Sequence, residues 1–531
     1  MLNENVIAKC RCILFIAPLL LPTIAAAQKL PTITQTGHTV KVEQLNGPCD
    51  WSSWDPKTQY GTPGPCGQTA AQAYPSQVLA QGLGYSFEDT ATGNLMLLFG
   101  DTVGYDPSAD PSAPHLRPDP AKGSFPPTAQ FNAKDTMAMS TTTTAGNTFS
   151  IQYYTSPLPD DPSAPLFITE LGKEYLPPQP DGEQPSYVGE GANVSMGPYD
   201  IPNSGISLKK ETYLIVNTGA QIVKGQLAAY SVLVKFDGVS TFTTGRTVSE
   251  TNYNYGAKTI VVGDKTLTPQ PLPGHFVFDA LAQIQAPFSL PIGPCSPPSC
   301  FNNPAVGIWG NGQFRADSLY FSYIPVSEFW SGVDGNGNPA TVYFAGFERD
   351  GVTPKWSNSE YDAVPVLPAD ATVGNASLFY DSNSSLWMMI FDGKIKDAKG
   401  IHFTYAATPW GPWQPSQLIY NECQAHTDNN QGFGDFIFYY AADKDHNDCP
   451  AALPPGTTTF PASAGPAGPV IGPGLDPFGA DAFTKRGAAF APEIIGRFSG
   501  STDGELKLQY TISTWNPYAV VRMETDFTIS K

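Results

Sequence analysis

The sequence is poor in charge, because only 15% of its 531 residues are Asp, Glu, Lys or Arg, and it contains only six histidines. Basic residues are the scarcer kind: 29 Lys and Arg stand against 48 Asp and Glu, which gives a formal net charge of −19. Such a surface repels phosphate backbones and anionic lipids, so we do not expect nucleic acid as a partner. A neutral partner such as a glycan is compatible with it, although solubility alone explains the charge equally well.

Long apolar runs are absent beyond the first 27 residues, so we expect no membrane span. At the start of the chain, Lys9 and Arg11 precede the apolar run 13–21, and three alanines follow at 25–27. This order is typical of a secretory signal peptide, and the run is too short to cross a bilayer. We therefore expect residues 1–27 to be removed and the protein to be secreted or periplasmic.

Cysteine is also scarce, with eight residues in all and six after the signal segment. An even number in an exported chain favours disulfides, and six cysteines permit 15 pairings. We favour bonds between sequence neighbours, each closing one loop: Cys49–Cys66, Cys295–Cys300 and Cys423–Cys449. No C-x-x-C, H-x-x-x-H, Gly-rich dinucleotide or P-loop pattern occurs, so we expect neither a metal nor a cofactor.

Turn formers and aromatic residues are abundant, with 52 Pro, 50 Gly and 12% aromatic residues. This composition favours an all-β protein with many loops. Short strand-like segments recur in five units, which we place at 83–154, 192–244, 305–346, 376–420 and 490–527. Five units of three or four antiparallel strands predict a five-bladed β-propeller, with two stacked β-sandwiches as the alternative.

The two ends of the chain are predicted to complete the propeller together. The last unit lacks a fourth strand, and residues 30–45 alternate like a spare strand. Pairing the two would close the ring and remove two exposed edges. We therefore divide the chain into the signal peptide at 1–27, a closing strand and disulfide loop at 28–79, and a single propeller domain at 80–531. The mostly apolar segment 275–281 is expected to be core rather than a site.

Leu98-Phe99-Gly100-Asp101-Thr102 ends an apolar run with a glycine and a carboxylate. This segment resembles the FGDT signature of one bacterial family, known as domain of unknown function 4185. The resemblance continues in the same order over residues 80–530, through segments at 134–138, 307–320, 373–377, 409–413, 491–493 and 513–518. It implies a five-bladed propeller and, since some family members are endo-acting D-arabinanases, glycoside hydrolysis. The chain departs from the family at Gly82 and Asn375, where an Asp and a Glu are common.

Glycoside hydrolysis usually needs two carboxyl groups, and the inner strands of a propeller can bring distant ones together. Our candidates for catalysis are Asp101, Asp135, Glu190 and Glu493, with Asp101 and Asp135 carrying the family match. Glu493 follows a proline in an apolar stretch, where burial would raise its pKa. For substrate binding we expect Trp309, Arg315, Asp317, Asn375 and Trp515. Each of these residues also has a purely structural interpretation, as a turn cap, an ion pair or a packing residue between blades.

The leading hypothesis is a secreted glycoside hydrolase that acts on an extracellular polysaccharide, such as the furanosidic glycan arabinan. The two missing carboxylates favour the alternative, a non-catalytic propeller that binds glycans. A surface interaction protein using the long Pro-rich loops is the third hypothesis. We expect a monomer, and its expected partner is a polysaccharide or an oligosaccharide.

Overall fold

A computed structural model describes the strands of the protein and most of the short connections between them. The residues that it describes are 30–46, 78–105, 130–132, 135–155, 201–223, 226–252, 260–262, 265–267, 274–285, 304–421, 488–515 and 519–530. The signal segment and all the cysteines lie outside these residues, so the predicted disulfides stay predictions.

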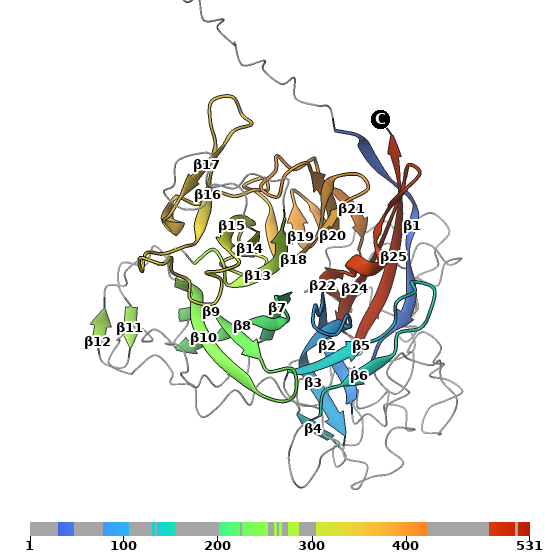
Figure 1. The fold of residues 1–531 in the computed structure, drawn as a ribbon, viewed down its shortest axis with the longest axis horizontal. Coiled ribbons are helices and arrows are strands. Elements are labelled where there is room, and N and C mark those ends of the chain that lie inside the picture. Colours follow the sequence, from blue (N-terminus) through green and yellow to red (C-terminus); the bar gives the residue numbers. More distant parts are fainter. Residues whose placement is uncertain are drawn as a thin grey trace, which may run out of the picture.

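Five antiparallel sheets are arranged around a common axis (Figure 1). Blade 1 contains β2 (Val78–Glu88), β3 (Leu95–Tyr105), β5 (Thr136–Ser140) and β6 (Ile151–Tyr153), with β4 (Gln130–Asn132) beside β3. Blade 2 contains β7 (Ile201–Leu208), β8 (Glu211–Val223), β9 (Gln226–Phe236) and β10 (Phe242–Asn252). Blade 3 contains β13 (Phe278–Ile284), β14 (Ala305–Asn311), β15 (Tyr320–Pro325), β16 (Val342–Phe347) and β17 (Pro354–Ser357).

The last two sheets complete the ring. Blade 4 contains β18 (Thr372–Asp381), β19 (Leu386–Ile395), β20 (Ala398–Ala406) and β21 (Gln417–Tyr420). Blade 5 contains β22 (Ala488–Ile494), β24 (Glu505–Trp515), β25 (Ala519–Ser530) and β1 (Thr32–Gln44), with β23 (Gly500–Thr502) beside β24. A separate hairpin of β11 (Ile260–Val262) and β12 (Lys265–Leu267) stands away from the blades (Figure 1). The prediction of a five-bladed propeller is confirmed.

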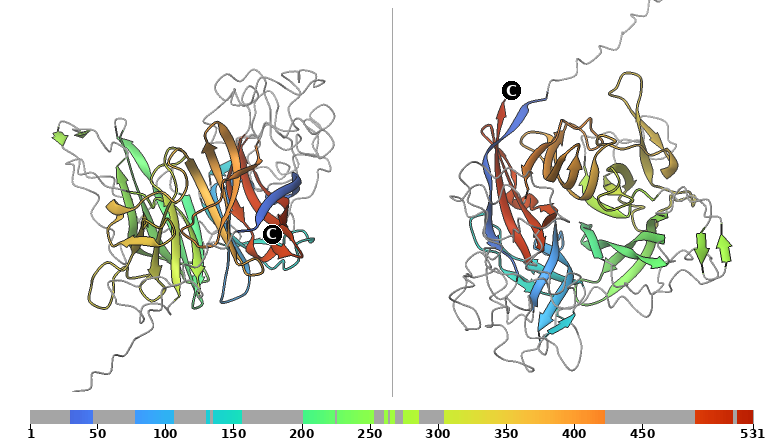
Figure 2. Two further views of the ribbon diagram at one scale, coloured as in Figure 1. Left: turned by 90° about the horizontal axis from the view of Figure 1, so that it is seen from above. Right: turned by 180° about the vertical axis from the view of Figure 1, so that it is seen from behind.

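The first strand of each sheet is the innermost strand, and these five strands form a ring. They contact one another in the order β2, β7, β13, β18, β22, and β22 contacts β2 again. The apolar core lies mainly between neighbouring blades; one cluster, for example, joins Trp309 and Phe321 of blade 3 to Trp387 and Phe391 of blade 4. Two further views show the blades from above and from behind (Figure 2). Strands distant in sequence therefore present their edges to one central space.

The N-terminal strand closes the ring, as predicted. β1 pairs antiparallel with β25, from Thr32 opposite Ser530 to Gln44 opposite Val521, so the last blade is built from both ends of the chain. The side chain of Thr39 also donates to the carbonyl of Ile419 in β21 at 2.8 Å. β1 thus covers the open edge of β25 and ties blade 5 to blade 4.

The third blade begins earlier than we predicted. Its innermost strand is β13, which pairs with β14 along its whole length, from Phe278 opposite Asn311 to Ile284 opposite Ala305. We expected the blade to start at residue 305 and the segment 275–281 to be plain core. Ala280 does lie in the core, but the same segment also carries the buried carboxyl group of Asp279, opposite Gly310 in the register. The long interval between β13 and β14 hid this pairing in the sequence.

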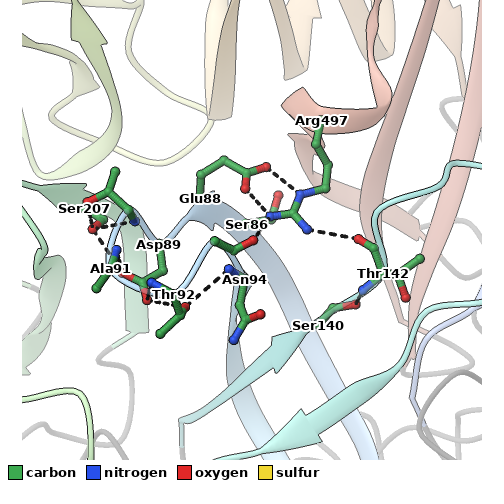
Figure 3. Close-up of polar contacts among 12 residues, drawn as sticks. Ser86, Glu88, Asp89, Ala91, Thr92, Asn94, Ser140, Thr142, Ser207 and Arg497 are labelled. Atoms are coloured by element: carbon green, nitrogen blue, oxygen red, sulfur yellow. Dashed lines mark hydrogen bonds and ion pairs between the residues drawn. The ribbon is translucent and has the colours of Figure 1, made fainter.

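Polar contacts at the turn after β2 join three blades (Figure 3). The Asp89 carboxylate accepts hydrogen bonds from the backbone of Ala91 and Thr92 and, at 3.1 Å, from the hydroxyl of Ser207 in blade 2. Arg497 lies in the 3₁₀ turn Gly496–Phe498, which follows β22, and binds the carboxylate of Glu88 with two nitrogens.

Over the residues that the structure describes, none of the helical segments has the length and apolar character needed to span a membrane.

Candidate functional site

Four of the five innermost strands are irregular where they line the axis. Their register shifts against the second strand lie at Leu83/Tyr85 in β2, Pro202/Ser204 in β7, Val373/Ala376 in β18 and Phe490/Glu493 in β22. A bulge turns side chains away from the direction that regular alternation would give them, and bulges are frequent beside active sites. The irregular backbone of these innermost strands therefore indicates a candidate site at the axis.

Backbone strain gathers at the same place. Leu83, Arg315 and Ala491 have φ of 69°, 55° and 49°, in the left-handed region that residues with a Cβ avoid. Leu83 and Ala491 lie within the innermost strands β2 and β22, whereas Arg315 lies in the turn between β14 and β15, as the other non-glycine residues with positive φ lie in turns between strands. Such strain costs about 1 to 3 kcal/mol per residue and persists where the surrounding structure enforces it, often at functional sites.

Glu493 is the predicted catalytic residue that the structure brings to the axis. The bulge at Phe490/Glu493 places it where β22 meets its neighbours, and its carboxyl interacts with Ser377 of β18 and with the backbone of Ser86 in β2. The residue as a whole is only partly buried, but burial of the carboxyl raises its pKa well above the usual range, against the opposing effect of these hydrogen bonds. Glu493 therefore keeps its proton at a higher pH than an ordinary glutamate.

Asp392 is a second carboxylate at the axis, and its surroundings are the opposite of those of Glu493. It lies near the end of β19 and is 1% exposed, yet Arg315 binds it through Nε at 2.8 Å and through Nη2 at 2.7 Å. The backbone N–H of Asn375 donates to it at 2.6 Å. The carboxylate rests on Gly374, where a Cβ would overlap it, so glycine is required there. Asp392 is thus a buried carboxylate held by a cation and a backbone donor.

Tyr85 lies within electrostatic range of both carboxyl groups. Burial raises its pKa well above the ordinary value, and Asp392 and Glu493 both add to this electrostatically. Its side chain is buried, and no described residue hydrogen-bonds its hydroxyl. Three strands from three blades therefore bring a carboxyl of raised pKa and a salt-bridged carboxylate into electrostatic range of one phenol.

A pocket of about 160 Å³ adjoins this group at the junction of blades 4 and 5. Its lining residues are Arg315, Thr372, Gly393, Lys394, Lys399, Gly400, Ala488 and Ala489. Arg315 belongs to both places, because its guanidinium binds Asp392 and also lines the pocket.

A second polar group lies on blade 3. Glu360, in a 3₁₀ turn (Glu360–Asp362), accepts hydrogen bonds from the hydroxyl of Ser249 at 2.8 Å and from the backbone of His275 at 2.7 Å. Burial raises the pKa of Glu360 and of Asp279, and the negative charge of Glu360 raises that of Asp279 further. The His275 ring stacks on Tyr320 with centroids 3.8 Å apart. These contacts join the 3₁₀ turn and the inner segment of blade 3 to Ser249 of β10 in blade 2, which suits a role in packing between blades.

The remaining predicted residues lie in different places. Asp135 is buried in blade 1 beside Gly100. Arg315 binds Asp392 through its guanidinium, and Asn375 binds it through its backbone N–H. Asp317 accepts from the backbone of Ser318 at 2.8 Å, as a turn cap does. Three predicted residues stay untested, because the side chains of Asp101 in β3 and Trp515 in β24, and the whole of Glu190, lie outside what the structure describes.

Trp309 does not fit its predicted role as a sugar-stacking residue. It has no exposed surface, its ring packs against Phe321 and Trp387, and its indole donates to the carbonyl of Pro409 at 2.9 Å. An alternating strand pattern next to glycines does not show whether a tryptophan faces the core between blades or the solvent. Trp309 packs in the aromatic core between blades 3 and 4.

Sequence reasoning missed Asp392 and Tyr85. A usable signal existed for Asp392, because the apolar run 386–391 ends at a carboxylate followed by Gly393, much as the run 95–99 ends at Gly100 and Asp101. Tyr85 gives no such signal, since an aromatic residue in a strand is most often plain core.

Comparisons with known proteins add little. No protein family and no curated protein matches the chain. Among solved structures, it is similar to an exo-1,5-α-L-arabinanase from a bovine ruminal metagenomic library, with 7% identity over 86% of this chain and 99% of that one, and a TM-score of 0.30. A TM-score of 0.30 is too low to establish a shared fold, so the assignment of the propeller depends on the strand order and pairing described above.

Proposed function

We propose that the protein is an exported glycoside hydrolase that cleaves a polysaccharide at the propeller axis, with Glu493 and Asp392 as its two carboxyl groups. The observation that carries this proposal is the contrast between their surroundings: burial raises the pKa of Glu493, whereas Arg315 and the N–H of Asn375 bind Asp392, and both groups act electrostatically on Tyr85. A pair of carboxyl groups with opposite environments is what separates an acid from a base or nucleophile in glycosidases.

In this mechanism Glu493 donates its proton to the glycosidic oxygen of the leaving group. Burial keeps that proton in place until a sugar oxygen accepts it. Asp392, fixed by Arg315 and by the N–H of Asn375, then either activates a water molecule or attacks the anomeric carbon. Tyr85 adds a buried hydroxyl within electrostatic range of both groups.

The resemblance of the motifs to those of endo-D-arabinanases supports a furanosidic substrate such as arabinan, and the pattern at 1–27 supports export. Binding without catalysis is the alternative, and one observation favours it. Gln81, next to the position where the family often has an Asp, donates from its amide to Thr102 and Thr136 and accepts from Tyr153 at 2.6 Å. Its polar atoms thus serve the blade rather than a substrate.

The test is the release of reducing ends from a panel of polysaccharides that includes arabinan and acidic glycans. We expect wild type to cleave at least one, and Glu493→Gln and Asp392→Asn each to lose about 100- to 10,000-fold in rate. Asp334→Asn, at an exposed turn of blade 3, is the matched control and should keep full activity. Because Asp392→Asn leaves Arg315 unpaired, Tyr85→Phe provides a milder second probe of the axis.

Wild-type binding to a glycan without any cleavage would establish the alternative. Equal activity of wild type and Glu493→Gln would contradict the assigned acid, even if the protein is a hydrolase.

A further inference from the structure

The turn between β14 and β15 carries an exposed phenylalanine, Phe314. Its side chain is 38% exposed, whereas every other phenylalanine whose side chain the structure describes is buried or half-buried. A single exposed aliphatic residue needs no explanation, but aromatic surface beside a candidate active site is what ligand-binding sites commonly use.

Phe278 supplies a second ring beside Phe314. It begins the innermost strand β13 and is half-buried. Its ring centroid lies 5.6 Å from that of Phe314, and the two planes are tilted by 46°. We call these two rings the phenylalanine platform. They offer adjacent, partly exposed apolar surface on blade 3.

Arg315 links the platform to the candidate active site. Its guanidinium carbon lies 5.1 Å from the centre of the Phe314 ring. The same guanidinium binds Asp392 of blade 4 and donates to the carbonyl of Ala489 in blade 5 at 3.4 Å. One side chain therefore separates the platform from the carboxylate proposed to act as base or nucleophile.

The backbone holds this turn in place. The N–H of Arg315 donates to the carbonyl of Val373 in β18 at 2.8 Å, and the N–H of Val373 donates to the carbonyl of Asp317 at 2.8 Å. Arg315 keeps its strained φ of 55° within this arrangement. A surface that is already ordered loses little conformational entropy when a ligand binds, so the fixed turn favours binding at the platform.

We propose that the phenylalanine platform is a subsite that stacks against one sugar ring of the polysaccharide, beside the bond that is cleaved. The proposal rests on the proposed function for the presence of a glycan at the axis. A sugar ring presents C–H groups on its faces and hydroxyl groups at its edge, so one of its faces matches an exposed aromatic surface. The platform thus takes the role that the sequence suggested for Trp309, which is buried.

Calorimetric titration of the whole protein tests the subsite without catalysis, in proteins that all carry Glu493→Gln. The probes are neutral oligosaccharides of arabinose, xylose and glucose, together with fragments of any polysaccharide that the wild type cleaves. Phe314→Ala and Phe314→Leu remove the ring, and Phe314→Tyr keeps it. The control is Val239→Ala, which shortens a 70% exposed apolar side chain at the turn between β9 and β10, the two strands of blade 2 furthest from the axis.

We expect Phe314→Ala and Phe314→Leu to bind at least one of these oligosaccharides about three- to tenfold more weakly, since only the exposed part of the ring is left to bury. Phe314→Tyr and Val239→Ala should bind it as tightly as the parent. With Glu493 restored, the loss of the ring should raise KM by a similar factor and leave kcat nearly unchanged, because stacking holds substrate and transition state alike.

The proposal is overturned if Phe314→Leu binds as tightly as the parent, or if none of the oligosaccharides binds. A fall in kcat at constant KM also overturns it, because Phe314 would then act only by placing Arg315.

Failure of this proposal and failure of the proposed function are distinguishable. Oligosaccharide binding that depends on the Phe314 ring, in a protein whose wild type cleaves no glycan, refutes the hydrolase alone. Cleavage with a KM that Phe314→Ala does not change refutes the platform alone.

Discussion

At the scale of residues, the axis keeps an acid protonated at a cost in stability. Burial holds the pKa of Glu493 well above its usual range, so the folded state prefers the protonated form. For a carboxyl of this kind the stabilising contribution is complete below the unfolded pKa, near 4.3, and is lost as pH rises toward the folded value. Burial of an ionisable group without a cation thus argues for function rather than for stability.

Glu493→Gln should therefore stabilise the protein relative to wild type as pH rises. We expect the two proteins to have similar unfolding free energies near pH 4, and the variant to gain up to about 1.4 kcal/mol per pH unit above it until the folded pKa is reached. Urea denaturation at several pH values measures this. A difference that is constant with pH would mean that Glu493 titrates normally.

The Asp89 turn shows the opposite sign. Burial by itself would raise the pKa of Asp89, but hydrogen bonds from Thr92, Ala91 and Ser207 outweigh it and lower the pKa. This contribution is therefore present above the unfolded pKa, near 3.9, and is lost as pH falls through the lower folded value. The charged form of Asp89 is the one that joins blade 1 to blade 2.

Asp89→Asn should destabilise the protein by about 1 to 3 kcal/mol at neutral pH, and by less as the pH falls through the folded pKa. Asp350→Asn is the matched control, because Asp350 makes the same turn bonds to residues two and three positions ahead and, among the described residues, none to another blade. Thermal unfolding of both variants compares them. An equal loss in the two would show that the bond to Ser207 contributes nothing.

At the scale of elements, regular strands were predictable and their irregular central parts were not. Apolar runs such as 95–99 and 386–391 fixed the position of β3 and β19, because strands buried on both faces leave a continuous signal. The bulges at Leu83/Tyr85 and Phe490/Glu493 depend on contacts between blades and leave no such signal. Glu493 was found from its apolar neighbours, but its partners Tyr85 and Asp392 were not.

The bulge at Val373/Ala376 gives an element-scale prediction. Gly374 supports the Asp392 carboxylate, and a Cβ there would overlap both of its oxygens. Gly374→Ala should therefore displace Asp392 from Arg315 and reduce activity more than stability. Gly335→Ala, at an exposed turn of blade 3 with open space around it and no positive φ, is the control for the loss of backbone freedom. Unchanged kcat in Gly374→Ala would show that the placement of Asp392 is not critical.

At the scale of the whole molecule, the ring is closed by strand pairing between the two ends of the chain. The alternation in residues 30–45 predicted this closure, because an unpaired edge on the last blade is costly. The innermost strand of blade 3 could not be predicted, since a long interval separates β13 from its partner β14. Sequence order alone could not say which strand lines the axis there.

Removing residues 30–46 should expose the edge of β25 and abolish soluble folding. Removing residues 260–267, the hairpin of β11 and β12 that stands outside the blades, is the control and should leave the unfolding temperature nearly unchanged (Figure 1). Soluble yield and thermal unfolding decide between them. A stable, soluble protein without β1 would mean that the other four blades and β25 hold the ring by themselves.

The central claim is that the axis holds a protonated carboxyl opposite a salt-bridged one. It is tested most directly by ¹³C NMR titration of the glutamate carboxyl carbons, with Glu493→Gln used to assign the signal of Glu493. We predict that this signal keeps its protonated chemical shift well above pH 4.3, where ordinary glutamates have begun to ionise. Titration of Glu493 at that ordinary pKa would contradict the account.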